Sequence, residues 1–180
     1  MGSYDYGKKE VCAWIRERFP TDSALLDVGA CDGKWKKLLP EYENFDAVEA
    51  WWNNLQNLGA YRNAFHADAR TFEYDWYDLI IFGDIVEHMT PAEAKDMLDY
   101  AAPRCKDMIV AVPFLYRQGA IHGNPFEVHV QDDLTAKIFE ERYPGFAVLC
   151  APMSGYCYYH KKEDEHGHCD YGQRKEFANG

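Results

Sequence analysis

The chain has 180 residues, of which 30 are Asp or Glu and 19 are Lys or Arg, giving a formal net charge of −11. This length suits one domain with a sizeable core and leaves no room for a second substrate-binding domain. The acidic balance argues against an extended nucleic-acid face, because phosphate binding needs clustered basic side chains.

The cysteines and the N-terminus indicate the compartment. The six cysteines form no C-x-x-C pair and no regular framework, which favours a reducing environment. The N-terminus lacks the apolar core of a signal peptide, and no apolar run is long enough to span a membrane. We therefore expect a cytoplasmic protein with no membrane segment.

The N-terminal 1–20 segment is expected to form a helix. Apolar side chains recur at helical spacing between residues 8 and 19, which indicates an amphipathic helix with one buried face. After it, the apolar residues 25–28 predict a first β-strand, which is followed at once by a turn containing Gly29 and Gly33. Glycines in such a turn let the backbone approach a ligand closely, and the helix that follows points N–H groups at it.

Two common nucleotide-binding patterns do not fit this turn. From Gly29 the chain reads Gly-Ala-Cys-Asp-Gly-Lys, which fails the dinucleotide pattern G-x-G-x-x-G at its third and sixth positions. The phosphate-binding pattern G-x-x-x-x-G-K-[ST] fails because the spacing is one residue short and Trp35 replaces the hydroxyl residue.

Acidic residues follow the next two predicted strands. Residues 46–49 predict a second strand ending at Glu49, which lies 22 residues after Asp27. A carboxylate at this distance is placed to accept hydrogen bonds from the ribose hydroxyls of an adenosine, although a surface Glu at a strand end is the plain alternative. A crossover helix is expected over 55–61, and Asp68 follows a short third strand.

The fourth predicted strand, residues 77–83, is a continuous apolar run of the kind found in parallel strands covered on both faces. Asp84, Glu87 and His88 follow it, before a helix over 92–102. Because ligands in open α/β sheets lie beyond the carboxyl ends of the strands, we expect these three side chains to converge at the site.

A long loop follows the fifth predicted strand, residues 108–113. Residues 114–131 include two glycines and carry Glu127 and His129, and a loop of this length is usually functional or mobile. We expect it to be a lid over the substrate.

The remaining segments complete one α/β domain over residues 1–160. A helix is expected over 132–143, and residues 146–151 and 156–160 read as a closing antiparallel pair. Residues 161–180 are expected to form a polar, disordered tail, in preference to a metal site built from the histidines and cysteine at 166–169.

Together these motifs resemble those of the class I S-adenosylmethionine-dependent methyltransferases. Asp27, Gly29, Gly33 and Trp35 match the first family motif, and Cys31 stands where the family has its middle glycine. The resemblance implies a Rossmann-like, doubly wound α/β domain whose sheet has seven mostly parallel strands and an antiparallel last strand.

The resemblance also implies S-adenosyl-L-methionine as the cofactor. In the family pattern the acid after the second strand binds the ribose, and the residues after the second and third strands lie along the adenine. The cofactor-binding residues expected on this basis are Asp27, Gly29, Ala30, Cys31, Gly33, Glu49, Ala50, Trp51, Asp68, Ala69 and Asp84.

The expected activity is O-methylation of a small-molecule hydroxyl, with a histidine as base. Methyl transfer needs an aligned acceptor, and a hydroxyl acceptor also needs its proton removed. His129 is the first candidate base because it lies on the lid loop and is neutral near pH 7, followed by His88 and then Glu87. A structural role is the plain alternative for each histidine.

Other functions stay open. The order Asp84-x-x-Glu87-His88 with a later His129 is similar to the set that holds a divalent metal in small-RNA 2′-O-methyltransferases. A divalent metal is kept as a less favoured alternative, because the Glu-His pair also occurs in small-molecule enzymes and the chain is acidic, with no appended RNA-binding domain. N-methylation is less favoured because the Asn/Asp-Pro-Pro-Tyr signature is absent. The alternative from a different class is a non-catalytic S-adenosylmethionine-binding module that acts through a protein partner. A dinucleotide-dependent oxidoreductase is more distant, because the glycine pattern fails.

The expected partner is a small-molecule acceptor and not a nucleic acid. A homodimer is left open, because the sequence does not determine the oligomeric state.

Overall fold

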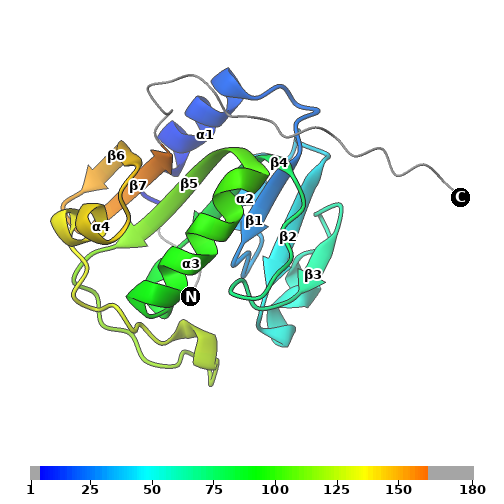
Figure 1. Ribbon diagram of the computed structural model, residues 1–180. Coiled ribbons are helices and arrows are strands. Elements are labelled where there is room, and N and C mark those ends of the chain that lie inside the picture. The colour runs from blue at the N-terminus through cyan, green and yellow to red at the C-terminus, as the bar shows by residue number, and fades with distance from the viewer. Residues whose placement is uncertain (1–4, 162–180) are drawn as a thin grey trace, which may run out of the picture.

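The computed structural model describes residues 5–161 and shows one mixed sheet between two layers of helices (Figure 1). The strands are β1 (Leu25–Val28), β2 (Phe45–Glu49), β3 (Ala64–His66), β4 (Tyr77–Gly83), β5 (Cys105–Pro113), β6 (Phe146–Met153) and β7 (Tyr156–Lys161). Their order across the sheet is β3-β2-β1-β4-β5-β7-β6, and β7 runs antiparallel to both of its neighbours. This confirms the predicted doubly wound fold with an antiparallel last strand.

The two helix layers cover opposite faces of the sheet. The α-helices are α1 (Lys8–Arg18), α2 (Lys34–Leu38), α3 (Pro91–Ala101) and α4 (Ala136–Arg142). The apolar side chains of α1 and α2 belong to one buried cluster, whereas those of α3 and α4 belong to the other. Short 3₁₀ helices occupy Trp52–Asn57, Val86–His88, Ala102–Arg104 and Pro125–Glu127.

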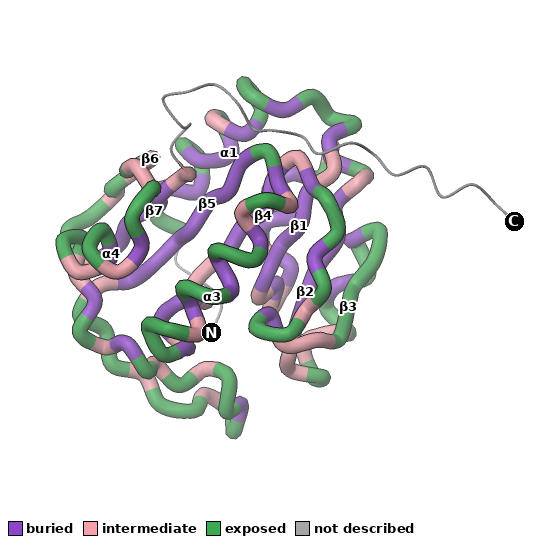
Figure 2. Tube along the Cα trace, in the orientation of Figure 1, coloured by how far each residue is buried: buried purple, intermediate pink, exposed green. Residues whose placement is uncertain are grey.

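The central strands supply apolar side chains to both clusters. On β4, Ile80 and Phe82 pack on the side of α3, whereas Leu79 and Ile81 pack on the side of α1. Successive side chains of a strand point to opposite faces, so a strand covered on both sides must be apolar throughout. Figure 2 shows this as a run of buried residues along the central strands.

Local signals explain where α3 begins. The Thr90 hydroxyl accepts a hydrogen bond from the backbone N–H of Glu93, and the Glu93 carboxylate accepts one from the backbone N–H of Thr90 at 2.9 Å. This reciprocal capping box satisfies two N–H groups that the first turn of a helix leaves unpaired.

Two expected helices differ from the structure. The helix predicted over 55–61 is wrong, because this segment contains only the end of the 3₁₀ helix Trp52–Asn57, followed by turns. The segment contains Asn57 and Gly59, and both residue types favour turns over a continued α-helix. The helix predicted from 132 begins at Ala136, because the Thr135 side chain accepts from the N–H of Ile138 at 3.2 Å and caps it.

The predicted polar tail, including the histidines and cysteine at 166–169, lies outside the described residues except for Lys161. Among residues 5–161, each helix is too short or too polar to cross a membrane.

The register of the parallel strands brings three turns together at one edge of the sheet. Val28 at the end of β1 lies opposite Val48 of β2 on one side and Phe82 of β4 on the other. The residues that follow each strand are therefore neighbours, and this edge is where ligands bind in doubly wound sheets.

Candidate functional site

A cavity of about 790 Å³ opens at this edge of the sheet. It is lined by turns after β1, β2, β3 and β4 on one side and by the loop after β5 on the other. The predicted site residues that line it are Gly29, Ala30, Cys31, Glu49, Ala50, Asp68, Ala69, Asp84, Glu87, His88 and His129. The predicted residues that do not line it are Asp27, Gly33 and Trp51.

The turn after β1 has the positive-φ backbone of a tight turn. Gly29 has φ +77°, and a Cβ built there would lie 2.8 Å from Cδ1 of Ile85. Cys31 also adopts a positive φ, 49°, which is uncommon for a residue with a side chain. The turn therefore folds tightly over the sheet edge, as the glycine pattern predicts.

Glu49 joins the first two turns. Its Oε2 accepts a hydrogen bond from the backbone N–H of Cys31 at 2.8 Å, and its Oε1 accepts one from the backbone N–H of Trp51 at 2.7 Å. The residue is buried, so these two bonds fix the direction of the carboxylate at the cavity wall. Each oxygen keeps a further lone pair for a ligand hydroxyl.

Asp27 lies beneath the cavity instead of in its wall. The Tyr61 hydroxyl donates a hydrogen bond to its Oδ2, and burial raises the pKa of Asp27 to about 7. The resemblance implied a direct contact with the cofactor, but this carboxylate is buried and does not line the cavity.

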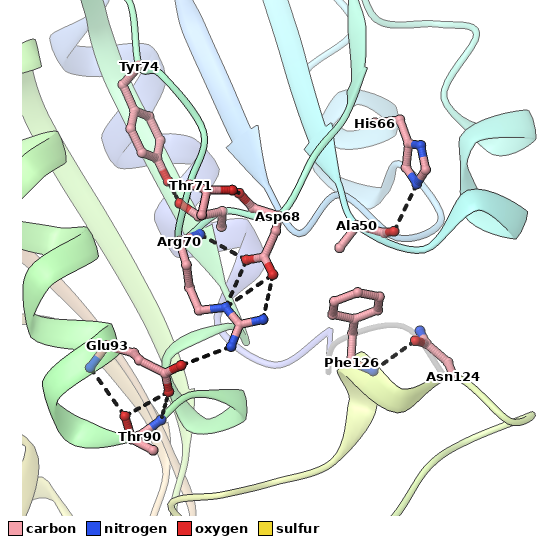
Figure 3. Close-up of polar contacts among 11 residues, drawn as sticks. Ala50, His66, Asp68, Arg70, Thr71, Tyr74, Thr90, Glu93, Asn124 and Phe126 are labelled. Carbon is pink, nitrogen blue, oxygen red and sulfur yellow. Dashed lines mark hydrogen bonds and ion pairs between the residues drawn. The ribbon is translucent and has the colours of Figure 1, made fainter.

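Asp68 is held by a neighbour that the sequence analysis missed. Arg70 makes an ion pair with Asp68, and its guanidinium also reaches Glu93 at 3.0 Å (Figure 3). The hydrogen bond from Arg70 lowers the pKa of Asp68 and keeps this carboxylate ionised as an acceptor. An Arg two residues after an acid is too common a pattern to have indicated this pair.

Two carboxyl groups with unpaired oxygens lie after β4. Asp84, at φ +53°, accepts a hydrogen bond from the Tyr156 hydroxyl on Oδ1 at 2.5 Å, while its buried Oδ2 has no partner among residues 5–161. Glu87 is only 1% exposed, and neither of its carboxylate oxygens has a hydrogen-bond partner in the described part of the chain. Burial raises the pKa of Asp84 and raises that of Glu87 well above its usual value, to which the charge of Asp84 adds.

His88 and His129 lie together although they are far apart in sequence. Their ring centroids are 4.7 Å apart in an edge-to-face arrangement. Nδ1 of His88 lies 3.2 Å from the carbonyl oxygen of Val128, and Nδ1 of His129 lies 2.7 Å from that of Tyr116. These contacts favour the tautomer in which Nδ1 carries the proton, which leaves Nε2 as the basic nitrogen of each ring.

Burial keeps both imidazoles neutral. It lowers the pKa of His88 to about 4, with a contribution from His129, and it also lowers the pKa of His129. Each ring can therefore accept a proton or bind a cation at neutral pH.

Glu87, His88 and His129 form a cluster of potential metal ligands. One ligand atom from each lies within 4.8 Å of the other two. Unpaired carboxylate oxygens and imidazoles whose Nδ1 is fixed by a carbonyl are the donor set and outer contacts typical of a divalent-cation site. The residues present therefore fit a cation, which the sequence analysis held to be the less favoured alternative.

Lys8 is a further residue that the sequence analysis did not select. Its ammonium is buried, lies 4.3 Å from the centre of the Trp35 ring, and has no hydrogen-bond partner within the described part of the chain. Burial lowers the pKa of Lys8, while Asp84 and Asp27 raise it. The available signal was its place at helical spacing with Cys12 and Ile15, on the buried face of α1.

Comparison with solved structures assigns the fold. The chain is similar to an S-adenosylmethionine-dependent methyltransferase from Clostridium acetobutylicum, with 13% identity and a TM-score of 0.68 over 88% of this chain and 92% of that one. It is similar to the methyltransferase domain of bacterial CtHen1, with 16% identity and a TM-score of 0.62 over 87% and 98% of the two chains. It also resembles the Synechocystis magnesium protoporphyrin IX methyltransferase with bound S-adenosylhomocysteine, with 15% identity and a TM-score of 0.59 over 86% and 81%.

No protein-family model and no curated protein sequence matches the chain. The structural likeness establishes that the chain has the fold of these methyltransferases.

Proposed function

We propose that this protein, which has the class I methyltransferase fold, binds S-adenosylmethionine and transfers its methyl group to a hydroxyl oxygen of a small-molecule acceptor. The observation that carries this proposal is one cavity whose wall includes two differently built parts, the turn with Glu49 after β2 and the turn with Glu87 after β4, which we call its two ends. Glu49 is fixed at one end by backbone N–H groups, and the unpaired Glu87 lies with two neutral imidazoles at the other.

The charge of the cavity supports the choice of cofactor. Its wall includes seven Asp or Glu residues against two basic residues, Lys34 and Arg70. A wall this acidic favours a cationic ligand such as a sulfonium, because the charges attract in a partly desolvated site. When bound, S-adenosylmethionine supplies an electrophilic methyl group whose leaving group is a neutral thioether.

The protein's own contribution begins with alignment. Glu49 would accept hydrogen bonds from the ribose hydroxyls, and the turn at Gly29 would let the backbone lie against the cofactor. Holding the acceptor in line and excluding water can lower the barrier by about 7–11 kcal/mol in the best-oriented cases.

The proton of the acceptor hydroxyl would move to a histidine. His129 is the first candidate because its Nδ1 is fixed by the Tyr116 carbonyl and its lowered pKa keeps Nε2 unprotonated. His88 is the second candidate, with the same arrangement on the Val128 carbonyl. A base placed in this way contributes about 10²–10⁴ in rate.

A cation-assisted version of the same transfer is the second candidate function. It is favoured by one observation, which is that both buried oxygens of Glu87 lack hydrogen-bond partners among residues 5–161 while His88 and His129 lie close by. Glu87, His88 and His129 would hold the ion, with Asp84 beside them. A divalent cation would supply Lewis acidity that lowers the pKa of the acceptor hydroxyl.

A methyl-transfer assay separates the two candidates. Transfer from labelled S-adenosylmethionine is measured across phenols, catechols and aliphatic alcohols, once with a chelator and once with Mg²⁺ or Mn²⁺. Activity that persists in the chelator supports the histidine base alone, whereas activity that requires the cation supports the second candidate. Absence of transfer to every acceptor under both conditions, by protein that binds the cofactor, would favour the non-catalytic binding module.

A further inference from the structure

The loop after β5 presents an aromatic ring to the cavity while it buries a polar side chain. Phe126 is 40% exposed and lines the cavity, whereas Asn124, two residues earlier, is only 5% exposed. A burial pattern in which the polar residue lies inside and the aromatic residue outside is the reverse of what packing alone favours. The arrangement therefore needs an explanation other than core formation.

Asn124 is used to build the turn that carries Phe126. Its Oδ1 accepts a hydrogen bond from the backbone N–H of Phe126 at 3.0 Å, and its own N–H donates to the carbonyl of Ile121 at 2.8 Å. His122 and Gly123, which lie between Ile121 and Asn124, both have positive φ, as in the tight turns that join the two strands of a β-hairpin. The ring is thus held at the end of a defined turn.

A second anchor fixes the other side of this turn. The Gln118 side-chain amide donates to the backbone carbonyl of Glu127 at 2.8 Å, and the N–H of His129 donates to the carbonyl of Gln118 at 3.0 Å. The segment that was expected to be a lid is therefore tied to itself on both sides of Phe126. A ring presented in this way loses little conformational entropy when it contacts a ligand.

The wall opposite Phe126 has the chemistry of a base-binding site. Figure 3 shows the Phe126 ring pointing into the cavity, across from Ala50 and Asp68. An ionised carboxylate at Asp68, next to the backbone of Ala69, suits a flat heterocycle that carries an amino donor beside a ring-nitrogen acceptor. Adenine has this edge, and its faces stack on aromatic rings.

We infer that Phe126 stacks on the adenine ring of the cofactor and that the turn from Ile121 to Glu127 is built to place it there. This inference rests on the proposed function, and it assigns the loop after β5 to cofactor selection as well as to the acceptor. Phe126 is then the residue that favours an adenosine-bearing ligand over one without a flat base.

The test is a calorimetric titration with two ligands that share the adenosine but differ in the group attached to its 5′ sulfur. S-adenosylhomocysteine carries the amino-acid part, and 5′-deoxy-5′-methylthioadenosine lacks it. Each ligand is titrated into the wild-type protein, Phe126→Ala, Phe126→Tyr and Val130→Ala. Val130 is the matched control because it is an exposed apolar residue of the same loop that does not line the cavity.

The inference predicts that Phe126→Ala weakens both ligands by the same factor, about tenfold, as for the loss of one stacked base. Phe126→Tyr and Val130→Ala should both bind within about twofold of the wild type, because Tyr keeps the flat ring and Val130 lies off the cavity wall. If circular dichroism shows that Phe126→Ala is unfolded, Phe126→Leu takes its place.

Two results would overturn the inference and leave the proposed function standing. One is unchanged binding of both ligands by the variant that lacks the ring. The other is weaker binding of S-adenosylhomocysteine alone, which would place the ring at the amino-acid part. If the folded wild type binds neither ligand, the proposed function fails and this inference fails with it.

Discussion

Glu49 and Glu87 are buried carboxyl groups in the wall of one cavity, yet their surroundings are opposite. Both oxygens of Glu49 accept backbone N–H groups, whereas neither oxygen of Glu87 has a partner within residues 5–161. A buried polar group that is satisfied stabilises its surroundings, and one that is not satisfied destabilises the fold unless a ligand completes it. The turn with Glu49 therefore has its hydrogen bonds in place before a ligand binds. The turn with Glu87 lacks them until an acceptor or a cation binds there.

The largest expected effect is on methyl transfer and comes from the Glu87 end. His129→Asn should lower kcat by about 10²–10⁴, because the group that takes the acceptor proton or binds the cation is lost. The rate is measured with labelled S-adenosylmethionine at saturating acceptor.

The control for this variant is His122→Asn, which changes the same residue type in the same loop. His122 does not line the cavity, and Asn tolerates its positive φ of 51°. Equal losses in the two variants would show that the loop, and not the imidazole at 129, was responsible.

The next effect is on cofactor affinity and comes from the Glu49 end. Glu49→Gln should weaken binding of S-adenosylmethionine by about 10–100-fold, since a neutral amide cannot accept from two backbone donors and two ribose hydroxyls at once. Equilibrium dialysis with labelled cofactor measures this loss. Glu43→Gln, at an exposed position shortly before β2, serves as control, and a comparable loss there would contradict the role of Glu49.

The two carboxyl groups should also affect stability with opposite signs. Glu87→Gln should raise the free energy of unfolding at neutral pH by about 1–3 kcal/mol, because burial raises the pKa of Glu87, so that folding must protonate this carboxyl, a cost that an amide does not have. Glu49→Gln should lower the free energy of unfolding by a similar amount, because it removes an acceptor of two backbone N–H groups. Urea denaturation of both variants, without cofactor or divalent cation, measures the difference. If both variants were destabilised, the contrast between the two ends would be wrong.

The smallest expected effect is a pH dependence at Asp27. The folded protein holds the Asp27 proton up to about pH 7, whereas the unfolded chain releases it near pH ~4. The contribution of the Asp27 carboxyl to stability is therefore fully present below the pKa of the unfolded chain, and it is lost as the pH rises towards the pKa of the folded protein.

Asp27→Asn should remove this loss. Its free energy of unfolding should improve relative to the wild type by about 1–3 kcal/mol between pH ~5 and pH ~8, because Asn still accepts a hydrogen bond from Tyr61 and never ionises. Thermal or urea unfolding at both pH values gives the difference. A constant difference across the range would show that Asp27 ionises normally in the folded protein.

Patterns in the sequence explain why Gly29 and Glu49 lie at the same edge of the sheet. The turn at Gly29 and the acid at Glu49 follow strands that pattern and spacing identify, and the parallel register alone brings them together. The fold class is confirmed for the same reason, since continuous apolar strands must be covered on both faces.

The side-chain contacts that the sequence did not predict depend on tertiary structure. The proximity of His88 to His129 depends on how the loop after β5 returns over β4, and no spacing in the chain determines that path. The pairing of Asp68 with Arg70 and the burial of Lys8 against Trp35 also required side-chain positions. Asp27 matched its motif but does not line the cavity, because it is buried and accepts a hydrogen bond from Tyr61, a contact that the motif does not predict.

The measurement that tests the account most directly is calorimetric titration of S-adenosylmethionine into the wild type, Glu49→Gln and Glu87→Gln at neutral pH. The account predicts that the wild type and Glu87→Gln bind the cofactor with similar affinity, and that Glu49→Gln binds it at least about tenfold more weakly. A folded wild type that does not bind the cofactor would contradict the proposed function. Equal losses in the two variants would contradict the division of the cavity into a cofactor end and a reaction end.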